Sequence, residues 1–268
     1  MLDPDEPPIE RLKALMARLR DRENGCPWDV EQTYKTIAPY TIEEAYEVSD
    51  AIARNDMADL KEELGDLLFQ VIFYSQMAKE DGVFDFDAVT TAITDKMVRR
   101  HPHVFGDAEQ RTADSQTRAW EVQKAAERSA KRTKDSSILA NVPVALPALT
   151  RAEKLTKRAA RVGFDWPDAS RVFDKLDEEL SEVKEAVAEN DKSHIAEEIG
   201  DLLFVVANLA RKLDIDPETA LRSANYKFER RFRGVEQNLE AKDQSLAVST
   251  LEEMEAEWQA VKRTEKTP

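Results

Sequence analysis

Apolar residues recur along most of the chain at the three- and four-residue spacing of amphipathic α-helices, and no stretch alternates like a β-strand. In the first half this spacing predicts helices over residues 9–22, 57–80 and 85–100, with a turn at 23–29. Thr41 is placed to cap a helix carrying EEAYEVSDAIA, with Glu44 at the capping-box position. A fifth helix should contain Trp120. We therefore predict an all-α fold.

The second half repeats the same order of elements. Its spacing predicts helices over residues 147–162, 168–189, 192–213, 217–241 and 249–264. Residues 43–69 laid over 178–204 give fifteen identities in twenty-seven positions, including an Asn-Asp break at 55–56 and 190–191. We predict an internal duplication with two tandem helical bundles, an N-terminal domain over 1–125, a linker over 126–146 and a C-terminal domain over 147–268.

The most strongly repeated segment is EELGDLLF at 62–69, which returns as EEIGDLLF at 197–204. The helix that contains the first copy is apolar almost all round, which predicts a buried central helix. Buried acids on such a helix cost several kcal/mol unless a positive charge compensates them. Gly65 lies between two of them at a cost of roughly 1 kcal/mol, which suggests the close approach of a neighbouring backbone or a ligand.

Paired carboxylates give the strongest indication of chemistry. Glu44 and Glu47 are three residues apart, as are Glu63 and Asp66, so each pair projects from one helix face. The second copy repeats them as Glu179, Glu182, Glu198 and Asp201. In a chain with 54 acidic residues, such spacing also arises on solvated helix faces. Four converging carboxylates would need a cation, and oxygen-only ligands suit Mg²⁺ or Mn²⁺.

A di-iron bundle is the rival metal site, but it requires Glu-x-x-His motifs. The three histidines, His101, His103 and His194, have no glutamate three positions earlier. The sequence therefore favours a hard divalent cation.

Basic and aromatic residues recur on the later helices. The cations are Lys96, Arg99 and Arg100 in the first copy and Lys227, Arg230 and Arg231 in the second. They could neutralise a phosphate held by the metal, or they could pair with nearby acids. The Trp120/Lys124 and Trp258/Lys262 pairs share one spacing; each tryptophan could stack on a base or pack in the core.

Composition narrows the class of protein. A formal net charge of -15 argues against general binding to nucleic acid and against an anionic membrane surface. Cys26 is the only cysteine, so the chain has no intramolecular disulfide, and the apolar runs are short of a membrane span. The acidic, proline-rich start MLDPDEPPIE is unlike a signal peptide. We expect a cytoplasmic protein.

The motifs GCPWD, APYTIEEAYEV, EELGDLLFQV and RRHPHVFGD, with both acidic repeats, resemble the MazG nucleoside triphosphate pyrophosphohydrolase family over nearly the whole chain. The resemblance implies the all-α pyrophosphohydrolase fold and Mg²⁺-dependent cleavage of NTPs or dNTPs to nucleoside monophosphate and pyrophosphate. It also implies a homodimer.

By position, the resemblance assigns the metal ligands to Glu44, Glu47, Glu63 and Asp66, and to Glu179, Glu182, Glu198 and Asp201. The neighbouring acids Glu43, Glu62, Glu178 and Glu197 are candidates for a base or an outer ligand. The predicted mechanism is attack of metal-activated water on the α-phosphorus, with Lys227 and Arg230 steadying phosphate charge. Arg231, Trp258 and Lys262 complete the expected substrate-binding residues.

One difference between the two copies lies on the predicted helices that carry the basic residues, two positions before Lys96 and Lys227. Related proteins resemble the second copy in carrying an asparagine there, Asn225, where the first copy has Thr94. We therefore expect the C-terminal copy to be the main catalytic unit. The alternative function is a metal- and nucleotide-binding sensor or scaffold without turnover. The preferred base and sugar, the metal count and the physiological role stay open at this point.

Overall fold

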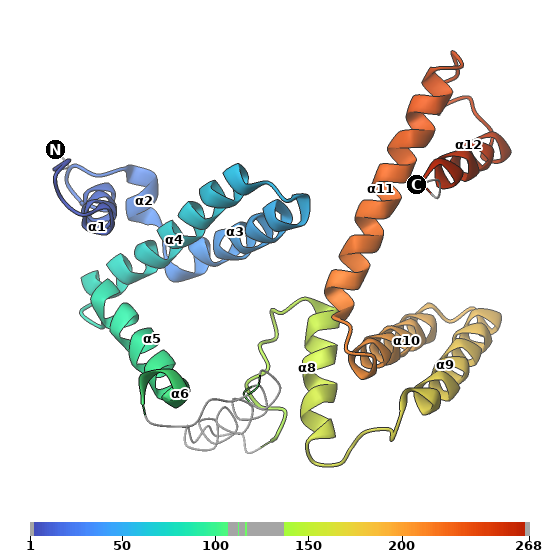
Figure 1. Cartoon of the computed structure of the whole chain (residues 1–268), viewed down its shortest axis with the longest axis horizontal. Helices are drawn as coiled ribbons and strands as arrows, with labels where there is room; N and C mark the ends of the chain where they lie inside the picture. Colours follow the sequence, from blue (N-terminus) through green and yellow to red (C-terminus); the bar gives the residue numbers. More distant parts are fainter. Residues whose placement is uncertain (1–2, 107–111, 113–115, 117–136, 266–268) are drawn as a thin grey trace. The chain divides into compact units, whose positions relative to one another are not determined.

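The computed structural model describes residues 3–106, 112, 116 and 137–265, and every regular element in these ranges is an α-helix (Figure 1). The chain divides into two compact units, Met1–Lys131 and Arg132–Pro268, and each is described by itself. The predicted fifth helix with Trp120 and Lys124, and most of the predicted linker, lie outside the described residues.

The first unit contains six helices in its described part. They are α1 (Pro8–Leu19), α2 (Pro27–Glu31), α3 (Tyr34–Arg54), α4 (Met57–Glu80), α5 (Phe86–Arg100) and α6 (Pro102–Phe105). Asp56 and Asp85 cap α4 and α5 by accepting hydrogen bonds from backbone N–H groups of the first turn. The turn predicted at 23–29 includes the start of the short helix α2, which begins at Pro27.

The predicted cap at Thr41 is wrong. The helix α3 is capped eight residues earlier, where Thr33 and Thr36 form a reciprocal capping box. Pro39 lies inside the helix, and its missing N–H and its ring normally disfavour that position, which is why the pattern indicated a later start. The Thr41 hydroxyl is instead 2.9 Å from the Tyr74 hydroxyl on α4, so this residue joins the two helices.

Helices α3 and α4 pair as a hairpin, and α1 packs on the C-terminal half of α4. The core of this unit gathers Met16, Ile37, Ile72, Phe73 and Met77. Arg20, the C-cap residue of α1, lies at the edge of this core, since its guanidinium pairs with Glu80 at 2.7 Å and lies over the Phe73 ring. The apolar part of the first unit is thus centred on the end of α4 away from its acidic residues.

The second unit repeats the hairpin. Its helices are α8 (Ala148–Ala160), α9 (Ala169–Glu189), α10 (Lys192–Lys212), α11 (Pro217–Glu240) and α12 (Leu251–Thr264). Asn190 ends α9 in the left-handed conformation and Asp191 caps α10, as Asn55 and Asp56 do between α3 and α4. The predicted Asn-Asp break is confirmed in both copies. It fixes the register in which the two acidic helices face each other.

The two hairpins are closed by ion pairs of opposite polarity. In the first, Arg54 at the end of α3 pairs with Asp59 on α4 and with Asp50 at 2.7 Å. In the second, Glu189 at the end of α9 lies 3.2 Å from His194 on α10. The basic residue thus belongs to the earlier helix in one hairpin and to the later helix in the other.

The prediction of a fully buried central helix holds for only part of its length. Leu64 and Leu68 on α4 are 50% and 38% exposed, and Ile199 and Leu203 on α10 are 43% and 50% exposed. The buried residues of α4 lie in its C-terminal half, where α1 covers it. Apolar positions beside the acids therefore form an open face.

Gly65 and Gly200 lie on this open face. A methyl group at either position would meet no other atom within 4 Å in the described chain. The expected close approach of a neighbouring backbone is therefore absent from the described part of the chain, and a ligand or a second copy could occupy the space.

Candidate metal and nucleotide site

Three carboxylates meet in each hairpin. In the second unit, Glu179 and Glu182 on α9 face Glu198 on α10, with one oxygen of each within 4.8 Å of the others. Glu44, Glu47 and Glu63 form the same cluster between α3 and α4. The helical spacing puts two acids on one helix face, and the Asn-Asp turn brings the third acid opposite them.

The cluster in the second unit is the more buried of the two. Glu179 is 4% exposed, and its Oε2 atom has no hydrogen-bond partner in the described chain. Its Oε1 atom is 2.7 Å from Lys175 Nζ, which also pairs with Glu178 at 2.7 Å. Burial raises the pKa of Glu182, and the charges of Glu179 and Glu198 raise it further, while Lys175 lowers it. The site therefore needs more positive charge than Lys175 provides.

His194 is a residue that sequence analysis missed at this site. Its Nε2 atom is 3.1 Å from Glu198 Oε1, and a hydrogen bond to Glu189, followed by the charges of Glu189 and Glu198, raises its pKa. The search for Glu-x-x-His could not find it because the histidine precedes its glutamate by four residues. That spacing, and the three- and four-residue spacing of Lys175 to Glu178 and Glu179, were available signals.

The first copy has the same three acids with different neighbours. Burial raises the pKa of Glu44, and the negative charges of Asp66 and Glu47 raise it further. Burial also raises the pKa of Glu63, and the negative charge of Glu47 adds to this effect. Gln70 donates to Glu44 over 3.4 Å, where the second copy has a valine. The first copy has a tyrosine where the second has Lys175. Identical acids thus lie in unlike surroundings.

The other predicted residues lie around or away from these clusters. Asp66 and Asp201 are exposed and fall outside the groups of three, although Asp66 is near enough to affect Glu44, so their roles as ligands stay predictions. Exposed side chains also include those of Glu43, Glu62, Glu178 and Glu197.

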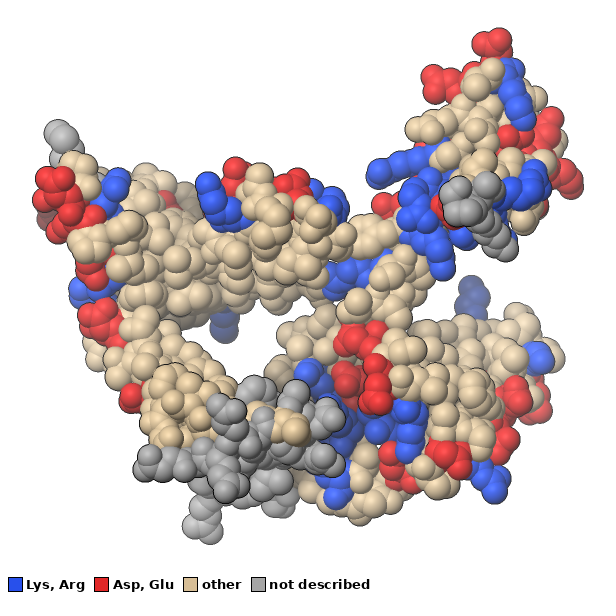
Figure 2. Space-filling view, in the orientation of Figure 1, with Lys and Arg blue, Asp and Glu red and all other residues tan. Residues whose placement is uncertain are grey.

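The predicted phosphate-binding residues lie on α11 and α12, where Lys and Arg gather in Figure 2. Arg230 and Arg231 both pair with Glu265 at 2.8 Å, so the structure gives them a partner other than the acidic cluster. Arg231 also lies over the Trp258 ring. Asn225 and Lys227 are exposed and Lys262 is half-buried. Their substrate-binding roles stay predictions.

A cavity of about 420 Å³ opens beside α10 in the second unit. Its walls include Phe164 and Trp166, two aromatic residues of the loop before α9, together with Phe204 and Asn208 of α10. Trp258 does not line it. The cavity is largely apolar, with a few polar groups at its floor and edge.

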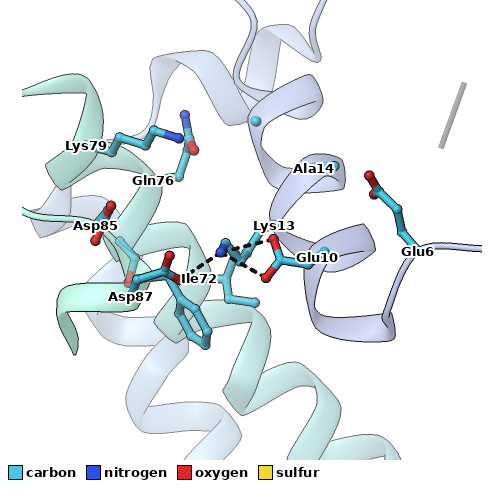
Figure 3. A pocket seen from close by; sticks show the side chains of 12 residues that line it. Glu6, Glu10, Lys13, Ala14, Ile72, Gln76, Lys79, Asp85 and Asp87 are labelled. Carbon is cyan, nitrogen blue, oxygen red and sulfur yellow. Dashed lines mark hydrogen bonds and ion pairs between the residues drawn. The ribbon is translucent and has the colours of Figure 1, made fainter. Parts of the chain in front are cut away.

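A second cavity, of about 320 Å³, lies among α1, α4 and the start of α5 in the first unit (Figure 3). Glu10 and Asp87 both bind Lys13, at 3.1 and 2.8 Å, and span this cavity. None of the clustered acids lines it. A lysine thus neutralises two of the acids that line this cavity, and that distinguishes it from the acidic cluster of the first unit.

No helix in the described ranges is long and apolar enough to cross a membrane.

Comparison with known proteins matches the family profile described as "MazG nucleotide pyrophosphohydrolase domain" twice, over residues 32–105 and 169–235. The chain is 52% identical over 261 residues to a nucleoside triphosphate pyrophosphohydrolase of Escherichia coli (strain K12), covering 96% of this chain and 98% of the relative. It is 41% identical over 259 residues to the Thermotoga maritima nucleoside triphosphate pyrophosphohydrolase/pyrophosphatase MazG, covering 97% of each. The two profile matches contain both acidic clusters.

Proposed function

Because the chain belongs to the MazG nucleotide pyrophosphohydrolase family, we propose that it hydrolyses nucleoside triphosphates to nucleoside monophosphate and pyrophosphate with Mg²⁺. Mn²⁺ is the expected substitute. One observation carries the proposal: three carboxylates converge in each hairpin, and in the second unit the buried Glu179 has an oxygen with no partner in the described chain.

The donor set fits the proposed metal. All the clustered side chains offer carboxylate oxygens, which hard divalent cations prefer. The ligands of the C-terminal site would be Glu179, Glu182, Glu198 and Asp201, and the first copy would use Glu44, Glu47, Glu63 and Asp66. Bound Mg²⁺ supplies positive charge beside the phosphate and activates water for attack at phosphorus.

The chain's own residues have separate tasks in this reaction. Glu178, exposed and next to Glu179 in the sequence, is the proposed acceptor of a proton from the attacking water. Lys227 and Arg230 neutralise phosphate oxygens, and Asn225, Arg231, Trp258 and Lys262 hold the substrate. Arg230 and Arg231 must exchange Glu265 for phosphate when substrate binds, since both pair with that carboxylate.

The C-terminal copy is the proposed main catalytic unit. Its cluster contains the more buried glutamate and a lysine that partly neutralises it, whereas the corresponding position in the first copy is Tyr40. A positive side chain beside the acids can move to the substrate phosphate when a metal takes its place. The first copy lacks this cation.

We further propose that the protein is a homodimer. Exposed apolar side chains lie beside the acids in both hairpins, and Figure 2 shows a largely uncharged surface along α3 and α4. A second hairpin packed on this face would complete a four-helix bundle. A cytoplasmic location is part of the same proposal, on the basis of the single cysteine.

Product analysis with NTPs and dNTPs, with and without Mg²⁺, tests the function. We expect monophosphate and pyrophosphate only with metal, loss of turnover in Glu198→Ala, and retained turnover in Glu63→Ala. The exposed Glu185→Ala on α9 is the matched control and should behave as the unmutated protein.

Two outcomes would contradict this assignment. Turnover that survives Glu198→Ala but is lost in Glu63→Ala would move the main active site to the first copy. Metal-dependent nucleotide binding with no product from any nucleotide would favour the sensor function instead.

A further inference from the structure

The cavity beside α10 is lined by the side-chain amide of Asn208, whose orientation is fixed by its hydrogen bonds to Arg211. Asn208 is 1% exposed and lines the cavity. Its Oδ1 atom accepts from Arg211 Nε at 2.9 Å and Nη2 at 2.7 Å. An arginine side chain has donors only, so the amide oxygen must face it. The amide's remaining polar atom, Nδ2, is therefore a donor, and both side-chain hydrogen bonds that Asn208 makes to the described chain go to Oδ1 instead.

A second residue holds this arrangement in place. Asp165 pairs with Arg211 at 2.7 Å and with Lys212 at 2.8 Å. Burial alone would raise the pKa of Asp165, but hydrogen bonds from Lys212 and Arg211 lower it. Asp165 also lines the cavity and is less buried than Asn208, so the cavity offers an ionised acceptor beside a more buried donor.

The cavity lies along the helix that carries the acids. Asn208 follows Asp201 by seven residues, which places the two on nearly the same face of α10, about 10 Å apart along its axis. Phe164 and Trp166 supply aromatic walls that can stack on a planar ring. This separation is short enough for one nucleotide to place its phosphates near the acids and its base in this cavity.

The first copy has no equivalent donor. Phe73 occupies the position of Asn208, is 1% exposed and belongs to the core with Met16. Gln76 occupies the position of Arg211 and donates instead to Glu80. The polar floor is thus a feature of the C-terminal unit.

We propose that this cavity binds the nucleobase and selects bases with an exocyclic oxygen at the position farthest from the sugar: the 6-keto purines and 4-keto pyrimidines. The proposal rests on the proposed function. Asn208 Nδ2 donates to that oxygen, and Asp165 accepts from the adjacent ring N–H. A 6-amino purine or 4-amino pyrimidine presents a donor to Asn208, which leaves two donors facing each other without an acceptor.

Two substrate pairs that differ only at this edge test the proposal in the full chain. We expect kcat/KM to be about five- to tenfold higher for ITP than for ATP, and for UTP than for CTP, which is the effect of one hydrogen bond. Asn208→Asp keeps an oxygen for Arg211 and replaces the donor by an acceptor. Its ITP/ATP and UTP/CTP ratios should fall to one or below, while the half-buried Asn238→Asp on α11 should leave both ratios unchanged.

The failures of the two proposals are distinguishable. Turnover of all four nucleotides by the unmutated protein with equal kcat/KM within each pair would overturn the base selection and leave the pyrophosphohydrolase assignment standing. The same holds if Asn208→Asp folds, by its thermal midpoint, and keeps the original ratios. If no nucleotide is turned over, calorimetric binding of IMP and AMP decides: tighter binding of IMP supports the cavity assignment, and equal binding overturns it.

Discussion

At the scale of single residues, Lys175 is the contact that distinguishes the two acidic clusters. Its ammonium group neutralises Glu178 and the buried Glu179, and hydrogen bonds to both raise its pKa. We expect Lys175→Met to lower the free energy of unfolding by roughly 1–3 kcal/mol, because Glu179 is left buried without a partner for either oxygen. Urea denaturation of the metal-free protein measures this.

Added Mg²⁺ should restore most of the stability that this substitution removes, because binding to the folded state alone stabilises it. Lys184→Met, an exposed change on the same helix, is the control and should alter neither value. A variant as stable as the unmutated protein without metal would show that Lys175 does not neutralise the cluster.

Residue types and spacing predicted the acids of the clusters, since a helix places i and i+3 side chains together whatever surrounds it. Spacing could not predict which oxygens are left without a partner. Glu179 becomes 4% exposed only when α9 and α10 pack. Likewise, the orientation of Asn208 in the cavity depends on Arg211, which is held by the loop residue Asp165, forty-six positions before it in the chain. Helical periodicity does not connect residues so far apart.

At the scale of helices, the pair between Arg20 and Glu80 ties α1 to the end of α4. Burial alone would raise the pKa of Glu80, but hydrogen bonds from Arg20 and Gln76 lower it below the ordinary 4.5. An acid whose pKa is lower in the folded state contributes stability above its unfolded pKa. That contribution is lost as the pH falls through the folded pKa.

We therefore expect Glu80→Gln to destabilise the protein by about 1.5–3 kcal/mol at pH 7, the value of a hydrogen bond to a charged group. The difference should shrink below pH 4.5 and vanish at lower pH. Urea denaturation across this pH range, beside the exposed Glu31→Gln, gives the comparison. A deficit that stays constant with pH would exclude charge as its cause.

Helix positions were predicted well where a cap and a break coincide, as at Asn190 and Asp191. They were predicted poorly where tertiary packing overrides a local preference. The helix α3 continues through Pro39 because it packs against α4 and is capped at Thr33. A prediction from sequence includes the penalty for proline but not this packing, so it starts the helix too late.

At the scale of the whole molecule, the open face of each hairpin is the surface through which we propose that two copies associate. Leu203 is 50% exposed beside the acids of α10. Leu203→Glu should shift the proposed dimer towards monomer and reduce activity by at least about tenfold, because a charge cannot be buried in an apolar interface without a partner. Sedimentation velocity measures the assembly, and circular dichroism checks that the helices persist.

Val248→Glu, at an exposed apolar position outside the hairpins, is the control and should leave the dimer intact. Monomeric behaviour of the unmutated protein would refute the assembly without touching the chemistry of the acids. The apolar positions were evident from the sequence, and we predicted from them a buried central helix. Periodicity alone does not distinguish a residue of the core from one of an interface.

The opposite polarity of the two closing ion pairs bears on how a duplicated chain avoids mispairing during folding. The two hairpins share most of their sequence, so α3 could pair with α10, and α9 with α4. The first exchange would bring Arg54 to His194, and the second would bring Glu189 to Asp59, in each case like charges at the turn. Only the native pairings place opposite charges together. While His194 is protonated, the two closing pairs therefore favour each helix's own partner over the corresponding helix of the other copy.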